Sequence, residues 1–485
     1  MSGHLSQPRG PFARPVGVFA VAAAALAASL ATAAMLRDER FVFLATGLWA
    51  LALMLVPYAR AERPGLFSVW SFVVLTVGIG VTARGVCLTL GYPEAGRLDE
   101  LYFRGREAAF FFEPALALLT GLGMLVLGHE WRVRRPGPVD LAPVCPDRLR
   151  LVCVAVLVVS AAATWLYVSR TGGWQGGDWS GKRTPIPGLD VAGTGYQSHG
   201  GLRFAASLAG FGHVLAVAGW FAAPAGRRIG WAVLAAALLL VAVAVPFHAS
   251  LRTPLVLLLV LPAAMVHLAG RRIRPAALAA TVVAALLAIQ VMTVLRNSGS
   301  DRDAAIDPPT PAALFDAAVL NRNQIELPKT AHLYHAVPRE LPVAWGATVA
   351  RWVLAPIPRS LWPDKPVIQP GPIVGQTLYD QPIAGVPPSL VGELFWNFHW
   401  PGVIIGAFLI GLALRMVEAV FQPIRGGDPM RAALFVAGPM TMGFEMVGGS
   451  IGSGLFRGCL QTAVMLGLLW LAQDLSRVRH SSVPR

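Results

Sequence analysis

Long apolar runs alternate with short polar connections along most of this chain. Each run holds about twenty residues, the length that a helix needs to cross the hydrocarbon core of a bilayer. Only a helix satisfies its own backbone hydrogen bonds in lipid, so the runs predict membrane-spanning helices. We expect these helices at roughly residues 16–36, 41–59, 66–90, 108–128, 149–168, 202–222, 229–247, 253–270, 275–296, 401–416, 431–448 and 452–473.

The connections between these helices differ in charge on the two sides of the membrane. One set is basic throughout, and basic loops mark the cytoplasmic side. With about twelve helices, both termini fall on that side. The arginines assigned to it are Arg9, Arg14, Arg60, Arg63, Arg132, Arg134, Arg135, Arg148, Arg150, Arg227, Arg228, Arg271, Arg272, Arg274, Arg415, Arg425, Arg431, Arg477, Arg479 and Arg485.

Composition agrees with this pattern. Hydrophobic residues make up 55% of the chain and charged residues 14%, which excludes an ordinary soluble globular protein. The formal net charge of +14 is spread over membrane edges rather than gathered on one domain, so we expect no nucleic-acid partner. The first apolar run ends in "ATA", which resembles a signal-peptide cleavage site, but the length of the run favours an uncleaved anchor. The predicted fold class is an all-α polytopic membrane protein.

Two external segments interrupt the helices. We divide the chain into 1–296 (nine helices, with an external loop at 169–201), 297–400 (a large external, periplasmic domain), 401–473 (three helices) and 474–485 (a cytoplasmic tail). Helical spacing of apolar residues predicts a helix over 311–326 and a short amphipathic piece over 344–358. Frequent proline predicts an ordered, non-helical chain around and after them, with an apolar helix starting directly after Pro401. A loop this long inside a compact protein is usually functional.

Charged residues inside the predicted spans gather near one end. Ionisable groups in a bilayer are costly and by default indicate function. Arginines outnumber acids in this set, and surplus guanidinium groups at an outer interface favour an anion such as a phosphate or diphosphate. The alternative is snorkelling with local ion pairs, Glu113 with Arg84 or Glu445 with Arg457, and Glu418 is an exception near the cytoplasmic end. The residues near the outer ends are Arg84, Glu113, Arg203, Arg252, Arg296, Glu445 and Arg457.

Four short motifs resemble one family. "SLRTP" (250–254), the "NR" of Asn321 and Arg322, "PIPRSLWPDKP" (356–366) and "PPSLVGELFWNFHWPG" (387–402) are similar, in this order, to motifs of the O-antigen polymerase family, which is related to the O-antigen ligases. The resemblance covers roughly residues 245–415. One departure is His399, which stands where the family often has glycine.

The resemblance implies a fold, an activity and partners. We expect a GT-C-like glycosyltransferase architecture in the bacterial inner membrane. The implied enzyme polymerises polyprenyl-diphosphate-linked oligosaccharide repeat units into O-antigen, capsule or exopolysaccharide at the outer face. Its donor and acceptor are both such lipid-linked oligosaccharides in the bilayer, and a chain-length regulator is a further candidate partner. We expect no cofactor and a metal-independent reaction, since the chain supplies arginines but no convincing metal cluster. The cysteines have no zinc spacing, and the spacing of His332 and His335 would allow a zinc pair without an obvious third ligand.

The candidate cation residues follow from the chemistry of diphosphate departure. Negative charge grows on the leaving group, and fixed cations aimed at it lower the barrier. We expect Arg252 and Arg296 to bind the diphosphate, with Arg322 or Arg359 completing the clamp and Arg170 as a further candidate. Arg252 is placed at a helix N-terminus, a good phosphate site. The structural alternatives are a turn cap for Arg252 and loop bonds to backbone carbonyls for Arg322 and Arg359.

A base must take the proton of the acceptor hydroxyl. Glu393, in a tight apolar stretch at the membrane, is the first candidate, and a carboxylate that binds amides of the following helix is its structural alternative. His335 is the second, and His332 lies three residues before it on one helical face. Either histidine could instead bond the backbone. Tryptophans that could stack on sugars, or equally form an interfacial belt, are Trp174, Trp179, Trp362, Trp396 and Trp400.

Three other functions remain open. A ligase that moves the glycan to a lipid core is not separated from a polymerase by these motifs. A lipid or polysaccharide transporter predicts broken helices near the bilayer midplane and repeat symmetry. A scaffold of an export complex would not need the arginines.

Overall fold

Helices form the regular structure of the part of the chain that can be described. The computed structural model describes residues 13–60, 64–92, 106–133, 136–170, 200–248, 251–271, 273–297, 310, 312, 315, 318–320, 324–357, 361–362, 364–379, 385–424 and 426–473. The helices longer than eight residues are α1 (Ala13–Met35), α2 (Phe41–Ala59), α3 (Val69–Val77), α6 (Phe112–Glu130), α7 (Pro146–Arg170), α8 (Gly200–Ala222), α9 (Arg228–His248), α10 (Arg252–Leu268), α11 (Pro275–Asn297), α13 (Leu327–Ala336), α15 (Pro370–Tyr379), α16 (Ser389–Pro401), α17 (Ala407–Phe421), α18 (Pro429–Ala437) and α20 (Ile451–Leu471).

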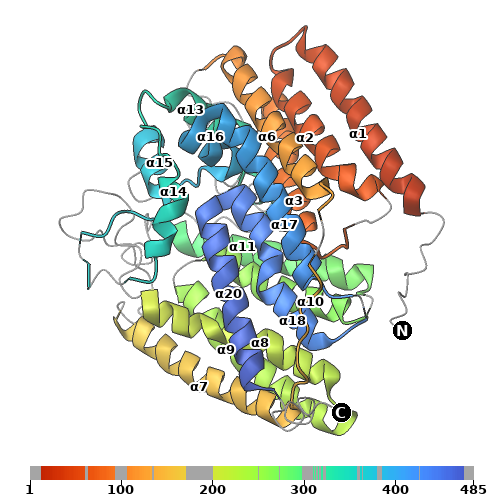
Figure 1. The fold of residues 1–485 in the computed structure, drawn as a ribbon, viewed down its shortest axis with the longest axis vertical. Helices are drawn as coiled ribbons and strands as arrows, with labels where there is room; N and C mark the ends of the chain where they lie inside the picture. The colour runs from red at the N-terminus through yellow and green to blue at the C-terminus, as the bar shows by residue number, and fades with distance from the viewer. Residues whose placement is uncertain are drawn as a thin grey trace.

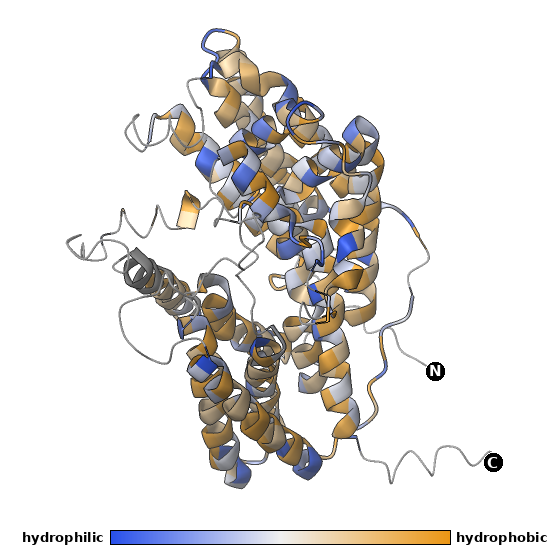
Figure 2. Ribbon diagram, turned by 90° about the vertical axis from the view of Figure 1, so that its left-hand side faces the viewer, coloured by the Kyte–Doolittle hydropathy of each residue, from blue (hydrophilic) through white to orange (hydrophobic). Residues whose placement is uncertain are grey.

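Nine helices within the described ranges are long and apolar enough to cross a membrane. Hydrophobic residues predominate along the helical ribbons, and many hydrophilic residues lie at helix ends and in connecting segments (Figure 2). These observations confirm the prediction of an all-α polytopic membrane protein. Two further apolar stretches, Thr253–Leu268 and Ala279–Ala288, are shorter, so twelve crossings remain a prediction.

Ion pairs and a backbone hydrogen bond join several of the arginine-rich helix ends. Arg60 Nη1, after α2, lies 2.9 Å from Glu130 Oε2 at the end of α6. Arg227, just before α9, pairs at 3.2 Å with Asp147 at the start of α7. Cys145 N donates to Ala472 O at 2.9 Å, which joins the start of α7 to the end of α20. Helices α13, α15 and α16 gather at the upper-left end of the molecule (Figure 1).

Several predicted spans are not simple α-helices, and the tenth contains a π-helical stretch, Gly402–Gly406. The third continues from α3 through a π-helical stretch, Gly78–Ala83, into the short helix α4 (Arg84–Thr89). The eleventh was expected to be continuous over 431–448, and this is wrong. Helix α18 stops at Gly438 (φ −114°, ψ −90°), and the chain proceeds through short turns to a π-helix, Glu445–Gly449. Proline at 439 lacks a backbone N–H for a helical hydrogen bond, and the glycines adopt non-helical conformations readily, so both residue types favour these breaks. The glycines are at 438, 443, 448 and 449.

The external segment is more helical than proline content predicted. Helix α13 occupies 327–336 and α15 occupies 370–379, where a non-helical chain was expected. Helix α16 begins at Ser389, but non-helical φ and ψ at Phe398 and His399 divide it, so a helix resumes close to Pro401, where the sequence predicts an apolar helix to begin. The amphipathic piece over 344–358 contains α14 (Ala347–Ala350) and a 3₁₀ turn, Arg351–Leu354. Half of the predicted helix over 311–326, and residues 171–199 of the first predicted external loop, lie outside the described residues.

Helices α6 and α17 meet backbone to backbone. A Cβ added at Gly128 would lie 2.0 Å from Phe408 O, and one added at Gly411 would lie 2.0 Å from Leu125 O. Small residues at such positions let membrane helices approach closely. The two glycines therefore allow the backbones of α6 and α17 to lie in direct contact.

We predict different effects on the thermal midpoint for two glycine substitutions in α6. Gly128→Ala forces α6 from α17 and should lower the thermal midpoint of the detergent-purified protein. Gly123→Ala meets nothing within 4 Å and should leave the midpoint unchanged or raise it, since alanine costs about 0.5–1 kcal/mol less than glycine in a helix. The measurement is loss of the monodisperse size-exclusion peak on heating, and equal midpoints for the two variants would contradict the close contact.

Candidate functional site

The Glu393 side chain lies at the centre of a buried hydrogen-bond network in α16. It is 0% exposed. Thr348 Oγ1 donates to its Oε1 at 2.7 Å, and the backbone N–H of Ile451, the first residue of α20, donates to its Oε2 at 2.7 Å. One carboxylate therefore joins α14, α16 and α20.

Asn397, one turn after Glu393, completes this network. Its Nδ2 donates to Thr348 Oγ1 and to Glu393 O, each at 2.7 Å, and its Oδ1 accepts from Gly346 N at 2.7 Å. The hydroxyl of Thr348 thus accepts from the amide while it donates to the carboxylate. Side-chain hydrogen bonds therefore hold the turn at 344–350 on α16.

Backbone strain gathers around the same helix. Among the described residues other than glycine, positive φ occurs at Trp345 (46°), Ser389 (60°) and His399 (51°). They lie in the turn that α16 holds, at the start of α16 and near its end. Such conformations cost about 1–3 kcal/mol each and cluster at functional sites. The strain makes α16 and its turn the leading candidate for a functional element.

His399 stands where the similar motif of the O-antigen polymerase family often has glycine, and its backbone conformation bears on that difference. Its φ of 51° and ψ of −143° put a bend in α16 next to Phe398, in a backbone region that glycine adopts freely. The position therefore favours the glycine that the motif often carries, and this chain holds a histidine there at a cost in strain.

The carboxylate of Glu393 does not bind amides of the helix that follows it, the structural alternative considered from the sequence. It binds the first amide of α20 instead, which lies far along the chain. Each of its oxygens already accepts one hydrogen bond and the side chain is fully buried, so a substrate could reach it only after the surrounding groups move. Its role as a base remains a prediction.

His335, the second candidate base, lies on α13 and is partly exposed. Its Nε2 lies 2.9 Å from Phe110 O, and its ring stacks on Phe110 with centroids 4.0 Å apart. Since a carbonyl only accepts, Nε2 carries the proton, and in a neutral ring Nδ1 is the basic nitrogen. His332, on the same helix, is buried against Phe110 and Tyr379.

The structure positions only part of the predicted arginine cluster. Arg252 is the first residue of α10, as expected, and Arg296 is the penultimate residue of α11, but the side chains of both are outside the described set. Because α10 and α11 are successive, packed helices, these two positions lie at the same end of the pair. Arg322 and Arg359 lie outside the described residues. Arg170 ends α7 and is exposed.

Arg84 belongs to a buried cluster that the sequence did not reveal. It forms an ion pair with Glu326 and donates to Val319 O, so the alternative pairing of Arg84 with Glu113 is wrong. Lys329, fully buried on α13, donates from Nζ to Gln324 O at 2.5 Å. Burial, reinforced by the nearby Arg84 guanidinium, lowers the pKa of Lys329 well below its usual value. The cluster ties the external segment to α4.

The other ion pair considered from the sequence is present. Arg457 Nη1 on α20 lies 3.6 Å from Glu445 Oε2 in the π-helix before it. Within the described ranges, no group of three or more His, Cys, Asp or Glu side chains is suited to a metal ion.

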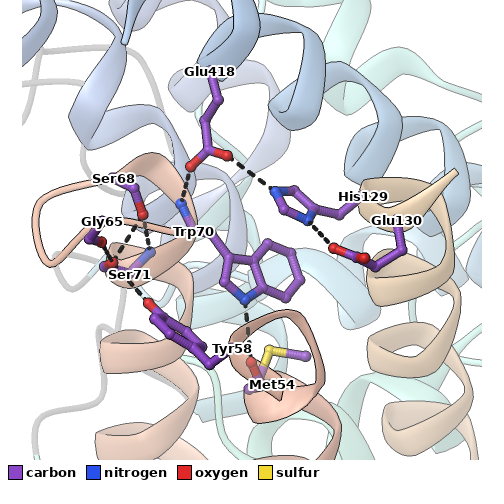
Figure 3. Close-up of polar contacts among 9 residues, drawn as sticks. All are labelled: Met54, Tyr58, Gly65, Ser68, Trp70, Ser71, His129, Glu130 and Glu418. Carbon is purple, nitrogen blue, oxygen red and sulfur yellow. Dashed lines mark hydrogen bonds and ion pairs between the residues drawn. The ribbon is translucent and has the colours of Figure 1, made fainter. Parts of the chain in front are cut away.

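A second polar cluster lies near the arginine-rich face, around Glu418 (Figure 3). Glu418 Oε1 accepts from Trp70 N at 2.8 Å, and its Oε2 lies 3.1 Å from His129 Nε2. His129 Nδ1 faces Glu130 Oε1 at 3.2 Å, and the Trp70 ring lies against the imidazole with centroids 4.2 Å apart. Both ring nitrogens face carboxylates, so the two contacts need two protons shared by one ring and two acids. Neither His129 nor Glu130 was singled out from the sequence.

No family model, curated protein or solved structure matches the chain. The motif resemblance and the geometry above are therefore the basis for a functional assignment.

We predict that His399→Gly stabilises the protein by about 1 kcal/mol, because glycine removes the strain at φ 51°. His399→Ala keeps a Cβ in the same conformation and serves as the control. Thermal midpoints of the two variants in detergent compare the effects, and a lower midpoint for the glycine variant would show that the histidine ring outweighs the strain.

We also predict that His129→Phe destabilises the protein by about 3 kcal/mol or more. Phenylalanine keeps a ring against Trp70 but leaves the carboxylates of Glu418 and Glu130 without their shared partner. Arg227→Ala, which removes an exposed ion pair, should change the thermal midpoint little. Similar shifts for the two variants would mean that the buried cluster adds no more than a surface pair.

Proposed function

We propose that this chain is a membrane glycosyltransferase that polymerises polyprenyl-diphosphate-linked oligosaccharide repeat units at the outer face of a bacterial inner membrane. The observation that carries the proposal is the segment 387–402. Its sequence resembles the polymerase motif, and its helix α16 holds a buried carboxylate, two strained residues and the external turn at 344–350.

The roles proposed for single residues follow from the reaction. Arg252 and Arg296 bind the diphosphate from the shared end of α10 and α11, and Arg322, Arg359 and Arg170 are further candidates for the same charge. A fixed cation aimed at the leaving group is commonly worth about 3 kcal/mol of barrier. His335 or Glu393 takes the proton of the acceptor hydroxyl. His335 needs the smaller change, because its Nδ1 is the nitrogen away from the Phe110 carbonyl.

The orientation supports an external site. Helices α13, α15 and α16 gather at one end of the molecule (Figure 1), and the charge rule assigns the arginine-rich helix ends to the cytoplasm. A ligase that transfers the finished glycan to a lipid core would use the same elements. The interrupted helix over 429–449 is a feature that also fits a transporter.

The test is complementation of a strain that lacks the chain. We expect Arg252→Ala to reach the membrane in normal amounts but to leave single repeat units on lipid, because the departing diphosphate loses a cation. Arg227→Ala, at the basic face, is the matched control and should restore long chains. Gel analysis of the lipid-linked glycan gives the readout.

The outcomes separate the candidates. Long chains from Arg252→Ala overturn the role of that arginine, and long chains in the deletion strain itself overturn the polymerase. If the deletion strain makes long chains that stay on the lipid carrier and are not transferred to the lipid core, the result indicates a ligase. Purified protein that moves the lipid across liposomes without extending it indicates the transporter.

A further inference from the structure

Glu113 is a carboxylate in an unusual setting. It lies in the first turn of α6, near the end of a candidate membrane span, and its side chain is exposed. Its neighbours Phe112 and Leu116 are 38% and 60% exposed, so the surrounding surface is apolar. A charged group at such a place is expensive and by default indicates a function.

A tyrosine hydroxyl, rather than Arg84, contacts this carboxylate. Arg84 is engaged by Glu326, and Tyr334 on α13 donates its hydroxyl to Glu113 Oε2 at 3.2 Å. Burial raises the pKa of Tyr334, which keeps the hydroxyl protonated and therefore a donor. The Tyr334 ring stacks on Phe395 of α16, with centroids 4.4 Å apart, so the hydroxyl is held in a fixed position.

Further aromatic rings extend this edge where α6, α13 and α16 meet (Figure 1). The Trp400 ring lies edge-on to Tyr334 at 6.4 Å, and the His335 ring lies edge-on to it at 5.3 Å. Tyr334, His335 and Trp400 are all partly exposed. A carboxylate that accepts, a fixed hydroxyl and amphipathic rings thus share one external edge.

The charge of this edge selects its ligand. An exposed carboxylate repels a diphosphate but accepts hydrogen bonds from hydroxyl groups. Partly exposed rings cover an apolar ligand face and offer a polar group at one end. A neutral sugar has both properties, with hydroxyls at its rim and C–H groups on its faces.

We propose that Glu113, Tyr334 and Trp400 form a binding site for the acceptor sugar of the growing glycan, next to His335. Glu113 accepts from a sugar hydroxyl, and Tyr334 fixes the carboxylate. This inference rests on the proposed polymerase function and adds the acceptor site to it. An interfacial aromatic belt, the alternative for the rings, would not need the carboxylate.

The test uses the full chain, purified in detergent, with lipid-linked repeat units extracted from the deletion strain as the probe. We expect Glu113→Gln to raise the KM for these units about tenfold or more, as for a lost hydrogen bond to a charged group, with a smaller change in kcat. Tyr334→Phe, which keeps the ring on Phe395, should raise KM less. Glu107→Gln changes an exposed carboxylate nearby on the chain and should behave like the wild type.

The outcomes distinguish this site from the proposed function. Wild-type KM values for both Glu113→Gln and Tyr334→Phe overturn the sugar site and leave the polymerase intact. Absence of chain growth by the wild-type protein overturns the polymerase and the sugar site with it. If Glu113→Gln fails to elute as a folded species, Glu113→Asp and Tyr334→Phe decide, with KM raised in both expected and KM unchanged in both refuting the site.

Discussion

The contact between the Glu393 carboxylate and the first amide of α20 is the constraint on which the external end depends. A helix start leaves backbone N–H groups without intrahelical partners, and burial makes each of them costly. Glu393 supplies an acceptor there while Thr348 supplies a donor to the same carboxylate. The turn at 344–350, the bend at His399 and the start of α20 are arranged around this one charge. Replacing Glu393 would leave several buried polar groups without hydrogen-bond partners at once.

Periodicity and charge predicted the membrane helices well because lipid imposes simple rules. Helical backbone and arginine-rich ends follow from the solvent alone, and the helix bounds of α2 agree with the prediction to the residue. The proline-rich segment that holds α13 and α15 was predicted less well from the same patterns. Proline suggested a non-helical chain, yet α15 begins at Pro370, since proline at a first turn loses no needed hydrogen bond. The break in the eleventh span depends on glycines whose effect is decided by tertiary packing.

The candidate site residues likewise divide into those that the sequence identifies and those that only the fold brings together. Glu393 and His335 were identifiable because a carboxylate and a histidine in an apolar stretch are conspicuous. Thr348 and Asn397 could not be found, because their importance arises from the contact that brings Thr348 to Glu393 and Asn397 from a distant part of the chain. Their shared place near the outer ends of predicted spans also suggested Arg84 as a partner for Glu113, whereas the fold brings Glu326 to Arg84 from a distant segment. Such pairings are set by topology, which hydropathy does not encode.

The glycine contact between α6 and α17 connects the two ends of the molecule. Helix α6 begins beside Glu113 and ends at His129 and Glu130, while α17 continues the chain from α16 and carries Glu418. Because their backbones approach closely at Gly128 and Gly411, a shift of one helix must be accommodated by the other. The pair therefore links the cluster of acids and imidazole at one end of α6 to the position of Glu113 at its other end.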